Sequence, residues 1–378
     1  MLQIPFNKPF LTGKETDYIR EAVESGKISG NGAFTQKCQR FLERRYGFKK
    51  VLLATSCTDA LEMAAILSDA GPGEEVIVPS FTFVSTALAF VRQGAKIVFA
   101  DSCADNPNVD VSQMEKLVTP RTKVLVVTHY AGVACDMDAV MELAHNHNLL
   151  VVEDAAQAID ATFKGWPLGG IGHLGCFSFH ETKNIIAGEG GALVVNDERF
   201  VRRSEIIWEK GTNRAEFFRG EVNKYGWVDT GSSFLPSEIT AAFLCAQLEH
   251  LEEIQVKRKL LWDAYAAGLS GLASKGLIRL PDIPDYASNN AHMFYIICSS
   301  LEDRTALIAH LKLHGIMAVF HYLPLHKSPY YAEKHDGREL PHADRFADCL
   351  LRLPMYYDLS VQQVTDICRT VQQFFIGK

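Results

Sequence analysis

The chain has 378 residues, of which 47% are hydrophobic and 22% charged, proportions typical of a globular protein with one large and one smaller domain. Its net charge of -7 excludes a general nucleic-acid-binding protein, which needs a basic surface. No apolar run reaches membrane-spanning length and no signal peptide is evident, so we expect a cytoplasmic protein. Nine scattered cysteines without a C-x-x-C pair indicate a reducing compartment, and no metal site is predicted.

The predicted elements begin with an extended, proline-containing arm and two amphipathic helices, over residues 13–25 and 34–46. From residue 50 to about 196, short apolar runs alternate with helical stretches. Such runs indicate strands covered on both faces, and the helices between them indicate crossover connections. The fold class is therefore α/β, a mostly parallel sheet between helices, with ligands expected at the carboxyl ends of its strands. The predicted strands are 51–54, 76–78, 97–99, 124–127, 149–152, 175–179 and 192–195.

Hydroxyl side chains follow the first predicted strand, at the start of a helix. In Thr55-Ser56-Cys57-Thr58, the Ser56 and Thr58 hydroxyls and the N–H groups of the helix start are suited to hold a phosphate. The alternative is ordinary helix capping. Residues 79–86 follow the second strand and place aromatic rings at its end. These rings either pack in the core or stack on a flat ligand ring, and the sequence leaves both alternatives open.

An acidic pair, Glu153-Asp154, directly follows the fifth predicted strand. A carboxylate beside a buried strand is unfavourable unless it has a partner. Asp154 is suited to meet a cationic ring nitrogen, and Gln157 offers an amide to the same ligand. The alternative is a helix-capping Asp154 beside a solvated Glu153.

Lys183 lies in a turn between the sixth strand and a glycine-rich loop that leads into the seventh. A loop lysine by itself is typically solvated. Here a phosphate cradle, an aromatic ring and a carboxylate are expected at the same sheet edge, and with a lysine these are the groups that pyridoxal phosphate (PLP) requires. The loop at residues 188–191 lacks the G-x-G-x-x-G spacing of a nicotinamide site. The sequence therefore predicts covalent chemistry at Lys183.

These motifs resemble those of the DegT/DnrJ/EryC1/StrS sugar aminotransferase family, of PLP fold-type I, over essentially the whole chain. Within the family they are most similar to transaminases that convert TDP-4-keto-6-deoxyglucose into TDP-4-amino-4,6-dideoxygalactose for surface polysaccharides. The resemblance implies PLP as cofactor, L-glutamate as amino donor, a dTDP-linked ketosugar as acceptor and a homodimer with active sites at the subunit interface. It rests on residues 55–58, 79–86, 129–135, 153–157 and 178–184.

Carried over residue by residue, the resemblance implies a Schiff base at Lys183 and a contact of Asp154 with the pyridine nitrogen. Gln157 would contact the ring hydroxyl, and Phe83 would stack on the ring. The implied phosphate contacts are Ser56, Thr58 and Ser178, and Cys57 is a further implied cofactor contact.

One position departs from the family pattern. Many relatives place an asparagine of the second subunit on the phosphate, after a tyrosine or phenylalanine, whereas this chain has Leu235 after Phe234. The resemblance therefore implies a different dimer contact, through Ser232 or Ser233.

A polar, glycine-punctuated loop over residues 210–227 follows a predicted helix at 198–209. The resemblance implies that this loop crosses to the partner subunit; the alternative is a surface loop. Residues 251–378 are predicted to form a smaller α+β domain, beginning with a helix at 251–269 and including strands at 293–297 and 318–321, and residues 1–250 the large PLP-binding domain. The candidate substrate contacts are Lys210, Arg214, Arg219, Tyr225 and, in the smaller domain, His326.

Three alternatives to this interpretation are considered. The family's sugar dehydratases carry histidine where this chain has Lys183, so the lysine argues against that activity. A PLP-binding regulator without turnover is the alternative from another class, and no DNA-binding segment supports it. The gluco epimer of the product, or another nucleotide-linked ketosugar, stays open because the epimers differ only in the face of the ketone carbon that receives nitrogen.

Overall fold

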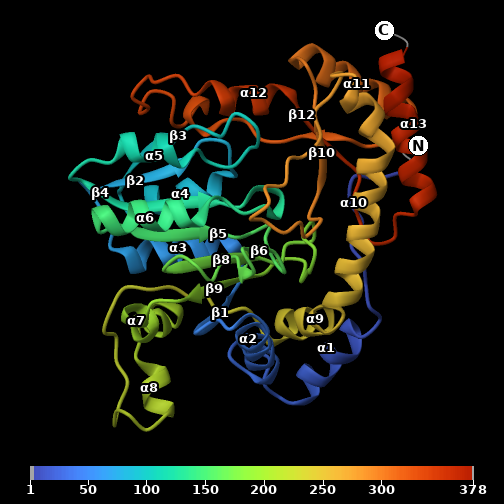
Figure 1. Cartoon of the computed structure of the whole chain (residues 1–378). Coiled ribbons are helices and arrows are strands. Elements are labelled where there is room, and N and C mark those ends of the chain that lie inside the picture. The colour runs from blue at the N-terminus through green and yellow to red at the C-terminus, as the bar shows by residue number, and fades with distance from the viewer. Residues whose placement is uncertain (1–3, 377–378) are drawn as a thin grey trace.

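The structure is a computed structural model that describes residues 4–376, and a seven-stranded sheet forms its centre (Figure 1). The strand order is β1-β9-β8-β5-β4-β2-β3, and only β9 runs antiparallel to its neighbours. All seven predicted strands and the α/β class are confirmed. The strands are β1 (Lys50–Ala54), β2 (Glu75–Pro79), β3 (Lys96–Ala100), β4 (Thr122–Thr128), β5 (Leu150–Asp154), β8 (Leu174–Ser178) and β9 (Gly191–Val195).

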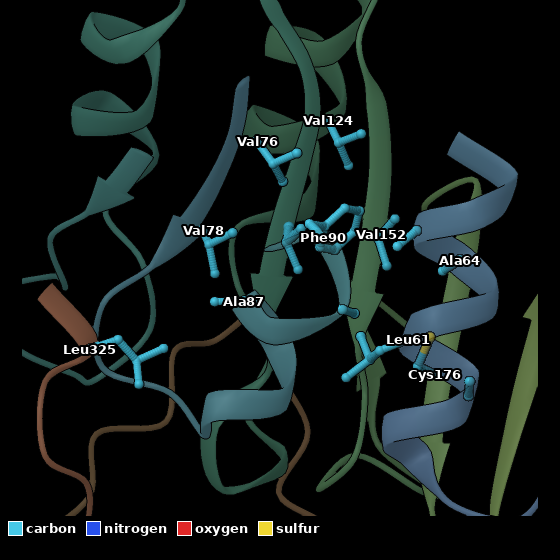
Figure 2. Close-up of a cluster of buried hydrophobic side chains, with 14 of the residues drawn as sticks. Leu61, Ala64, Val76, Val78, Ala87, Phe90, Val124, Val152, Cys176 and Leu325 are labelled. Carbon is cyan, nitrogen blue, oxygen red and sulfur yellow. The ribbon is translucent and has the colours of Figure 1, made fainter. Parts of the chain in front are cut away.

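Both faces of this sheet are covered, as continuous apolar strands require. Val76 and Val78 of β2 pack in one hydrophobic cluster with α3 and α4, whereas Ile77 between them packs in a second cluster with α2, α6 and α9. Figure 2 shows the first cluster, in which Phe90 of α4 lies beside Val152 of β5. Each such side chain, fully buried, contributes about 1.5–3 kcal/mol. The helices are α2 (Ala33–Tyr46), α3 (Cys57–Ser68), α4 (Val84–Arg92), α6 (Met137–His147) and α9 (Glu238–Glu249).

The C-terminal part has its own antiparallel sheet, in the order β10-β12-β11. The long helix α10 (Leu251–Ser274) runs from beside α9 to this sheet (Figure 1). The N-terminal arm also reaches it, because Ile4 pairs with Ile316 beyond α11. The strands are β10 (Phe294–Ile297), β11 (Val319–Phe320) and β12 (Leu350–Leu353), and the sequence prediction missed β12. We keep the domain division at residue 250 as a proposal.

The remaining elements connect these two sheets or cover their edges. No helix within residues 4–376 is both long and apolar enough to cross a membrane. The helices are α1 (Glu15–Glu24), α5 (Val111–Leu117), α7 (Glu198–Trp208), α8 (Arg214–Phe218), α11 (Leu301–Leu313), α12 (Pro341–Cys349) and α13 (Val361–Ile376), with a short hairpin of β6 (Thr162–Phe163) and β7 (Trp166–Pro167).

Candidate active site

A cavity of about 580 Å³ opens at the carboxyl ends of the central strands. Five strand ends contribute to it, because parallel strands deliver their following loops to the same edge. Its lining includes Ser56 after β1, Phe83 after β2, Thr128 of β4, Asp154 of β5 and Ser178 of β8. The C-terminal part closes the other side with His292, His321, Tyr322 and Arg352.

Asp154, the last residue of β5, is almost fully buried in the wall of the cavity. Its carboxylate accepts hydrogen bonds from the Thr86 hydroxyl at 2.6 Å and from the Ala156 N–H at 3.1 Å. Burial raises the pKa of this carboxyl above its ordinary value of 3.8, although both hydrogen bonds and the nearby Lys183 act in the opposite direction. A cation bound against Asp154 would therefore compensate a buried charge, which is the chemistry that a protonated ring nitrogen offers.

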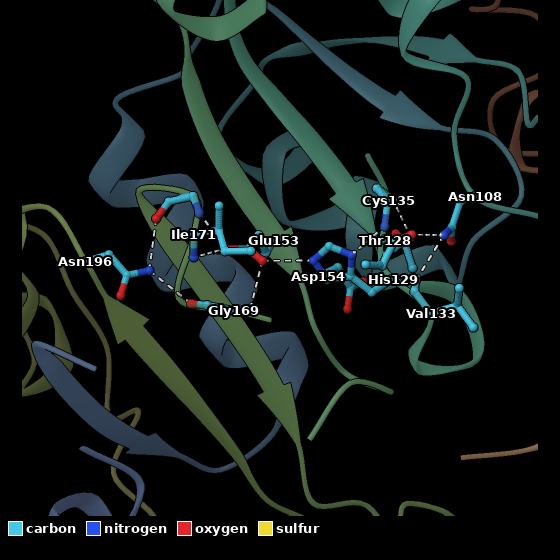
Figure 3. Close-up of polar contacts among 12 residues, drawn as sticks. Asn108, Thr128, His129, Val133, Cys135, Glu153, Asp154, Gly169, Ile171 and Asn196 are labelled. Carbon is cyan, nitrogen blue, oxygen red and sulfur yellow. Dashed lines mark hydrogen bonds and ion pairs between the residues drawn. The ribbon is translucent and has the colours of Figure 1, made fainter. Parts of the chain in front are cut away.

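Glu153 points to the opposite face of the sheet and is also fully buried (Figure 3). Its carboxylate accepts hydrogen bonds from three N–H groups of the 169–172 turn, at 2.5–2.8 Å. His129 Nδ1 accepts from the Cys135 N–H, so Nε2 carries the ring proton and donates it to Glu153 at 2.9 Å. The alternative of a solvated Glu153 is wrong, because the carboxylate is the centre of a buried network that fixes the end of β5.

Lys183 lies in the turn after β8, and its side chain lines the cavity. Its amine forms no hydrogen bond or ion pair with any residue of 4–376. Burial lowers the pKa of this amine below its ordinary value of 10.5, and Cys57 and Asp154 partly offset the shift. An unpaired lysine of lowered pKa is suited to act as a nucleophile.

The neighbouring Asn184 anchors the turn that carries this lysine. It is buried, and its amide nitrogen donates to Gln255 Oε1 at 2.8 Å and to the Asn290 carbonyl at 2.9 Å. Its amide oxygen lies 2.8 Å from Nδ1 of His292. Three contacts to residues more than 70 positions away thus fix the backbone beside Lys183, a role that the sequence did not reveal.

The start of α3 supplies a cradle of hydroxyl and N–H groups. Ser56 caps the helix by accepting from the Asp59 N–H at 3.0 Å, and the Thr58 and Ser85 hydroxyls lie 2.7 Å apart. The capping interpretation is therefore confirmed, and it leaves the N-terminal dipole of the helix facing the cavity. A Cβ on Gly191 would lie 2.4 Å from the backbone of Ser56, so only glycine lets β9 approach the cradle this closely. These donors, with Lys183 and Asp154, fit the phosphate, aldehyde and ring nitrogen of PLP.

Gln157 and Tyr322 form a bridge between the two sides of the cavity. Gln157 Oε1 accepts from the Ala131 N–H at 2.6 Å, and its Nε2 donates to the Tyr322 hydroxyl at 3.0 Å. The Tyr322 ring lies 6.1 Å from that of Phe83. Phe83 lines the cavity and is 56% exposed, which leaves its ring available to stack on a flat ligand.

Comparison with known proteins agrees with this geometry. Residues 9–372 match the model of the DegT/DnrJ/EryC1/StrS aminotransferase family. The chain belongs to this family. Enzymes of the family depend on PLP, so PLP is the cofactor of this sugar aminotransferase.

The alignments with relatives extend over nearly the full length of this aminotransferase. The spore coat polysaccharide biosynthesis protein SpsC of Bacillus subtilis strain 168 is 32% identical, over 99% of this chain and 97% of that protein. GDP-perosamine synthase of Escherichia coli O157:H7 is 31% identical over 100% of both chains. The structure of Spr1654 from Streptococcus pneumoniae in its PMP form superposes with a TM-score of 0.91 at 26% identity, covering 99% of this chain and 100% of that one. The fold and the enzyme class therefore agree along the full length.

The eight predicted cofactor residues all line the one cavity, whereas the five predicted substrate residues do not. Arg219 pairs with Glu205 and Glu221, and His326 is buried with its Nδ1 on the Ser80 hydroxyl. The loop that holds Lys210, Arg214, Arg219 and Tyr225 extends with α8 at one end of the molecule (Figure 1). The roles of these five residues stay predictions. The cofactor set is Ser56, Cys57, Thr58, Phe83, Asp154, Gln157, Ser178 and Lys183.

The prediction missed the cavity residues that come from the ends of the chain. Burial and nearby cations lower the pKa of His292 and of His321 well below the ordinary value, so both imidazoles are neutral. Arg352 and the arm residues Phe6 and Asn7 complete this side. One signal was available in the sequence, since Arg352 interrupts an otherwise apolar run, 350–355.

Proposed function

We propose that this aminotransferase moves the amino group of L-glutamate to C4 of a dTDP-4-keto-6-deoxyhexose, giving dTDP-4-amino-4,6-dideoxy-D-galactose for surface polysaccharides. The observation that carries the proposal is the unpaired Lys183 amine in one cavity with the buried Asp154 carboxylate. The motifs at residues 55–58, 79–86, 129–135, 153–157 and 178–184 support the dTDP-linked sugar. A GDP-linked ketosugar is the second candidate, because one full-length relative is a GDP-perosamine synthase.

Bound PLP supplies the electron sink for the bond that breaks at the donor's α-carbon. The Asp154 carboxylate would pair with the ring nitrogen and so keep it protonated. Lys183, with its amine free, would take the proton from the donor's α-carbon and pass it to the cofactor. The lowered pKa of Lys183 favours this step because more of the amine is neutral. In the second half of the reaction Lys183 would move a proton from the cofactor to C4 of the sugar.

The rest of the site orients these groups. The α3 cradle would hold the phosphate, and Phe83 and the Gln157–Tyr322 bridge would fix the plane of the ring. Because the ring plane is fixed, the face of the ketone that meets Lys183 decides the configuration of the new amine.

Adding L-glutamate to the purified holoprotein tests the reaction. The visible absorption of the lysine-bound cofactor should disappear, and dTDP-4-keto-6-deoxyglucose should restore it. An absorption that glutamate leaves unchanged would refute the transaminase proposal and leave a PLP-binding regulator. The proton coupling at the amino-bearing carbon of the product distinguishes galacto from gluco, and a parallel assay with a GDP-4-ketosugar tests the nucleotide.

We also propose a homodimer in which the 210–227 loop lies on the partner subunit. Aromatic side chains of this loop are exposed in the single chain, with Phe218 at 69%, Tyr225 at 51% and Trp227 at 85% of their surface. Exposed apolar groups gathered in this way are typical of protein–protein contacts. Light scattering should give twice the 42.0 kDa mass of the chain, and a Trp227→Ser variant should weaken the dimer.

A further inference from the structure

Three threonine hydroxyls form a continuous hydrogen-bonded chain that ends on Asp154. Thr86 of α4 donates to Asp154 Oδ2 at 2.6 Å. The Thr86 hydroxyl lies 2.9 Å from that of Thr82 in the loop after β2, and the Thr82 hydroxyl lies 3.0 Å from that of Thr128 at the end of β4. All three side chains are buried, with at most 6% of their surface exposed. Three separate elements therefore place this threonine relay behind the carboxylate.

The direction of each hydrogen bond in the relay follows from the chemistry of its two ends. A hydroxyl carries one proton and an ionised carboxylate only accepts, so the Thr86 proton goes to Asp154. The Thr86 oxygen then accepts from Thr82, and the Thr82 oxygen accepts from Thr128. All three O–H dipoles thus point their positive ends toward the carboxylate. Hydrogen bonds aligned in this way polarise and strengthen one another in a buried site.

The relay opposes the effect of burial on Asp154. Burial raises the pKa of this carboxyl, whereas the hydrogen bond from Thr86 lowers it. The other oxygen accepts from the Ala156 N–H at 3.1 Å, so one donor on each oxygen fixes the rotation of the carboxylate. Within residues 4–376, Thr86 is the one side chain that hydrogen-bonds to it. The other titratable groups around Asp154 are Lys183, His129, Cys57, Cys176 and Tyr322.

We propose that the threonine relay orients the Asp154 carboxylate and stabilises its negative charge, so that it pairs with the ring nitrogen of the cofactor. The inference rests on the proposed function, in which Asp154 keeps that nitrogen protonated. A neutral Asp154 would leave the ring nitrogen neutral as well and weaken the electron sink. The threonines are positioning residues, because they act through Asp154. Thr82 and Thr128 also line the cavity, so the test has to separate the relay from a direct ligand contact.

Binding of two probes to the cofactor-free protein tests the relay without turnover. The probes are PLP and its 1-deaza analogue, which has CH in place of the ring nitrogen and is otherwise the same molecule. Thr86→Val should weaken PLP binding by about 10-fold or more, as loss of a hydrogen bond to a charged group does. The affinity for the deaza analogue should change by less than about twofold, because that analogue has no nitrogen with which the carboxylate could pair.

Further variants separate the relay from a packing role. Thr86→Ser keeps the hydroxyl and should restore most of the affinity for PLP. Thr82→Val removes the second link and should weaken PLP binding about threefold, again sparing the deaza analogue. Nitrogen NMR of PLP labelled at the ring nitrogen should show a smaller protonated fraction in Thr86→Val than in wild type. Thr370→Val on α13 is the matched control, because this hydroxyl donates to the Asp366 carbonyl of its own helix, and it should behave as wild type.

Three outcomes would overturn the inference: an unchanged PLP affinity in Thr86→Val, an equal loss of affinity for PLP and the deaza analogue, or a Thr82→Val variant that binds PLP as wild type does. The second would assign the threonines to ligand contact or packing. Circular dichroism establishes that each variant folds; if Thr86→Val does not, Thr82→Val and Thr128→Val carry the test. If wild-type protein binds PLP but does not react with glutamate, the proposed function fails instead, and the two affinities still decide whether the relay acts.

Discussion

Replacing Glu153 with glutamine tests the buried network behind the active site. The substitution keeps the size of the side chain and exchanges one carboxylate oxygen for an NH₂ group. In the native network both oxygens accept: Oε1 from the Ile171 and Gly172 N–H groups, and Oε2 from the Gly169 N–H and from His129 Nε2. Wherever the NH₂ group is placed, it therefore meets two donors (Figure 3).

The expected loss of stability follows from the number of buried donors that lose their acceptor. If the NH₂ group faces the turn at residues 171–172, two backbone N–H groups lose their acceptor. If it faces His129, the Gly169 N–H is orphaned, and the imidazole must move its proton to Nδ1, where the Cys135 N–H already donates. Each unsatisfied buried donor costs about 1–3 kcal/mol, so Glu153→Gln should lower the free energy of unfolding by about 2–6 kcal/mol.

Urea unfolding of the cofactor-free protein, followed by circular dichroism, measures this loss. Glu115→Gln on α5 is the matched control, because Glu115 is exposed and its substitution should stay within about 0.5 kcal/mol of wild type. A Glu153→Gln variant as stable as this control would show that the network tolerates an amide, and the argument from donor counting would be wrong.

Three further predictions concern the cavity. Lys183→Ala should remove the absorption of the lysine-bound cofactor and lower turnover by more than about 1,000-fold, and a variant that still turns over would contradict its assigned role. Asp154→Asn should lower turnover by about 100-fold yet stabilise the cofactor-free protein at neutral pH. The sign follows from its raised pKa: the native state binds the proton more tightly than the unfolded state, so stability is lost as pH rises through the native pKa, and the difference between variant and wild-type melting temperatures should grow as the pH rises above the ordinary value of 3.8. Phe83→Leu should weaken PLP binding about 3- to 10-fold in a fluorescence titration, from the loss of stacking, with Val84→Leu as the control for a similarly exposed neighbour.

Local sequence patterns were sufficient for the seven strands of the central sheet and for bringing the candidate cofactor residues to one cavity. Apolar runs such as 76–78 and 124–127 are recognisable as strands, because a strand buried on both faces does not alternate between apolar and polar residues. Once the sheet is mostly parallel, the residues after its strands must gather at one edge, and for this reason Ser56, Asp154 and Lys183 could be placed together without coordinates.

Only the tertiary structure decided which of two adjacent carboxylates faces the cavity. Asp154 reaches Thr86 while Glu153 reaches the 169–172 turn and His129, a choice fixed by the register of β5 and not by residue type. The same holds for Arg352 and Phe6, which are separated by most of the chain and meet because the arm pairs with the C-terminal part. Contacts over such separations depend on the packing of whole elements, whereas sequence patterns report the few residues within a turn or strand.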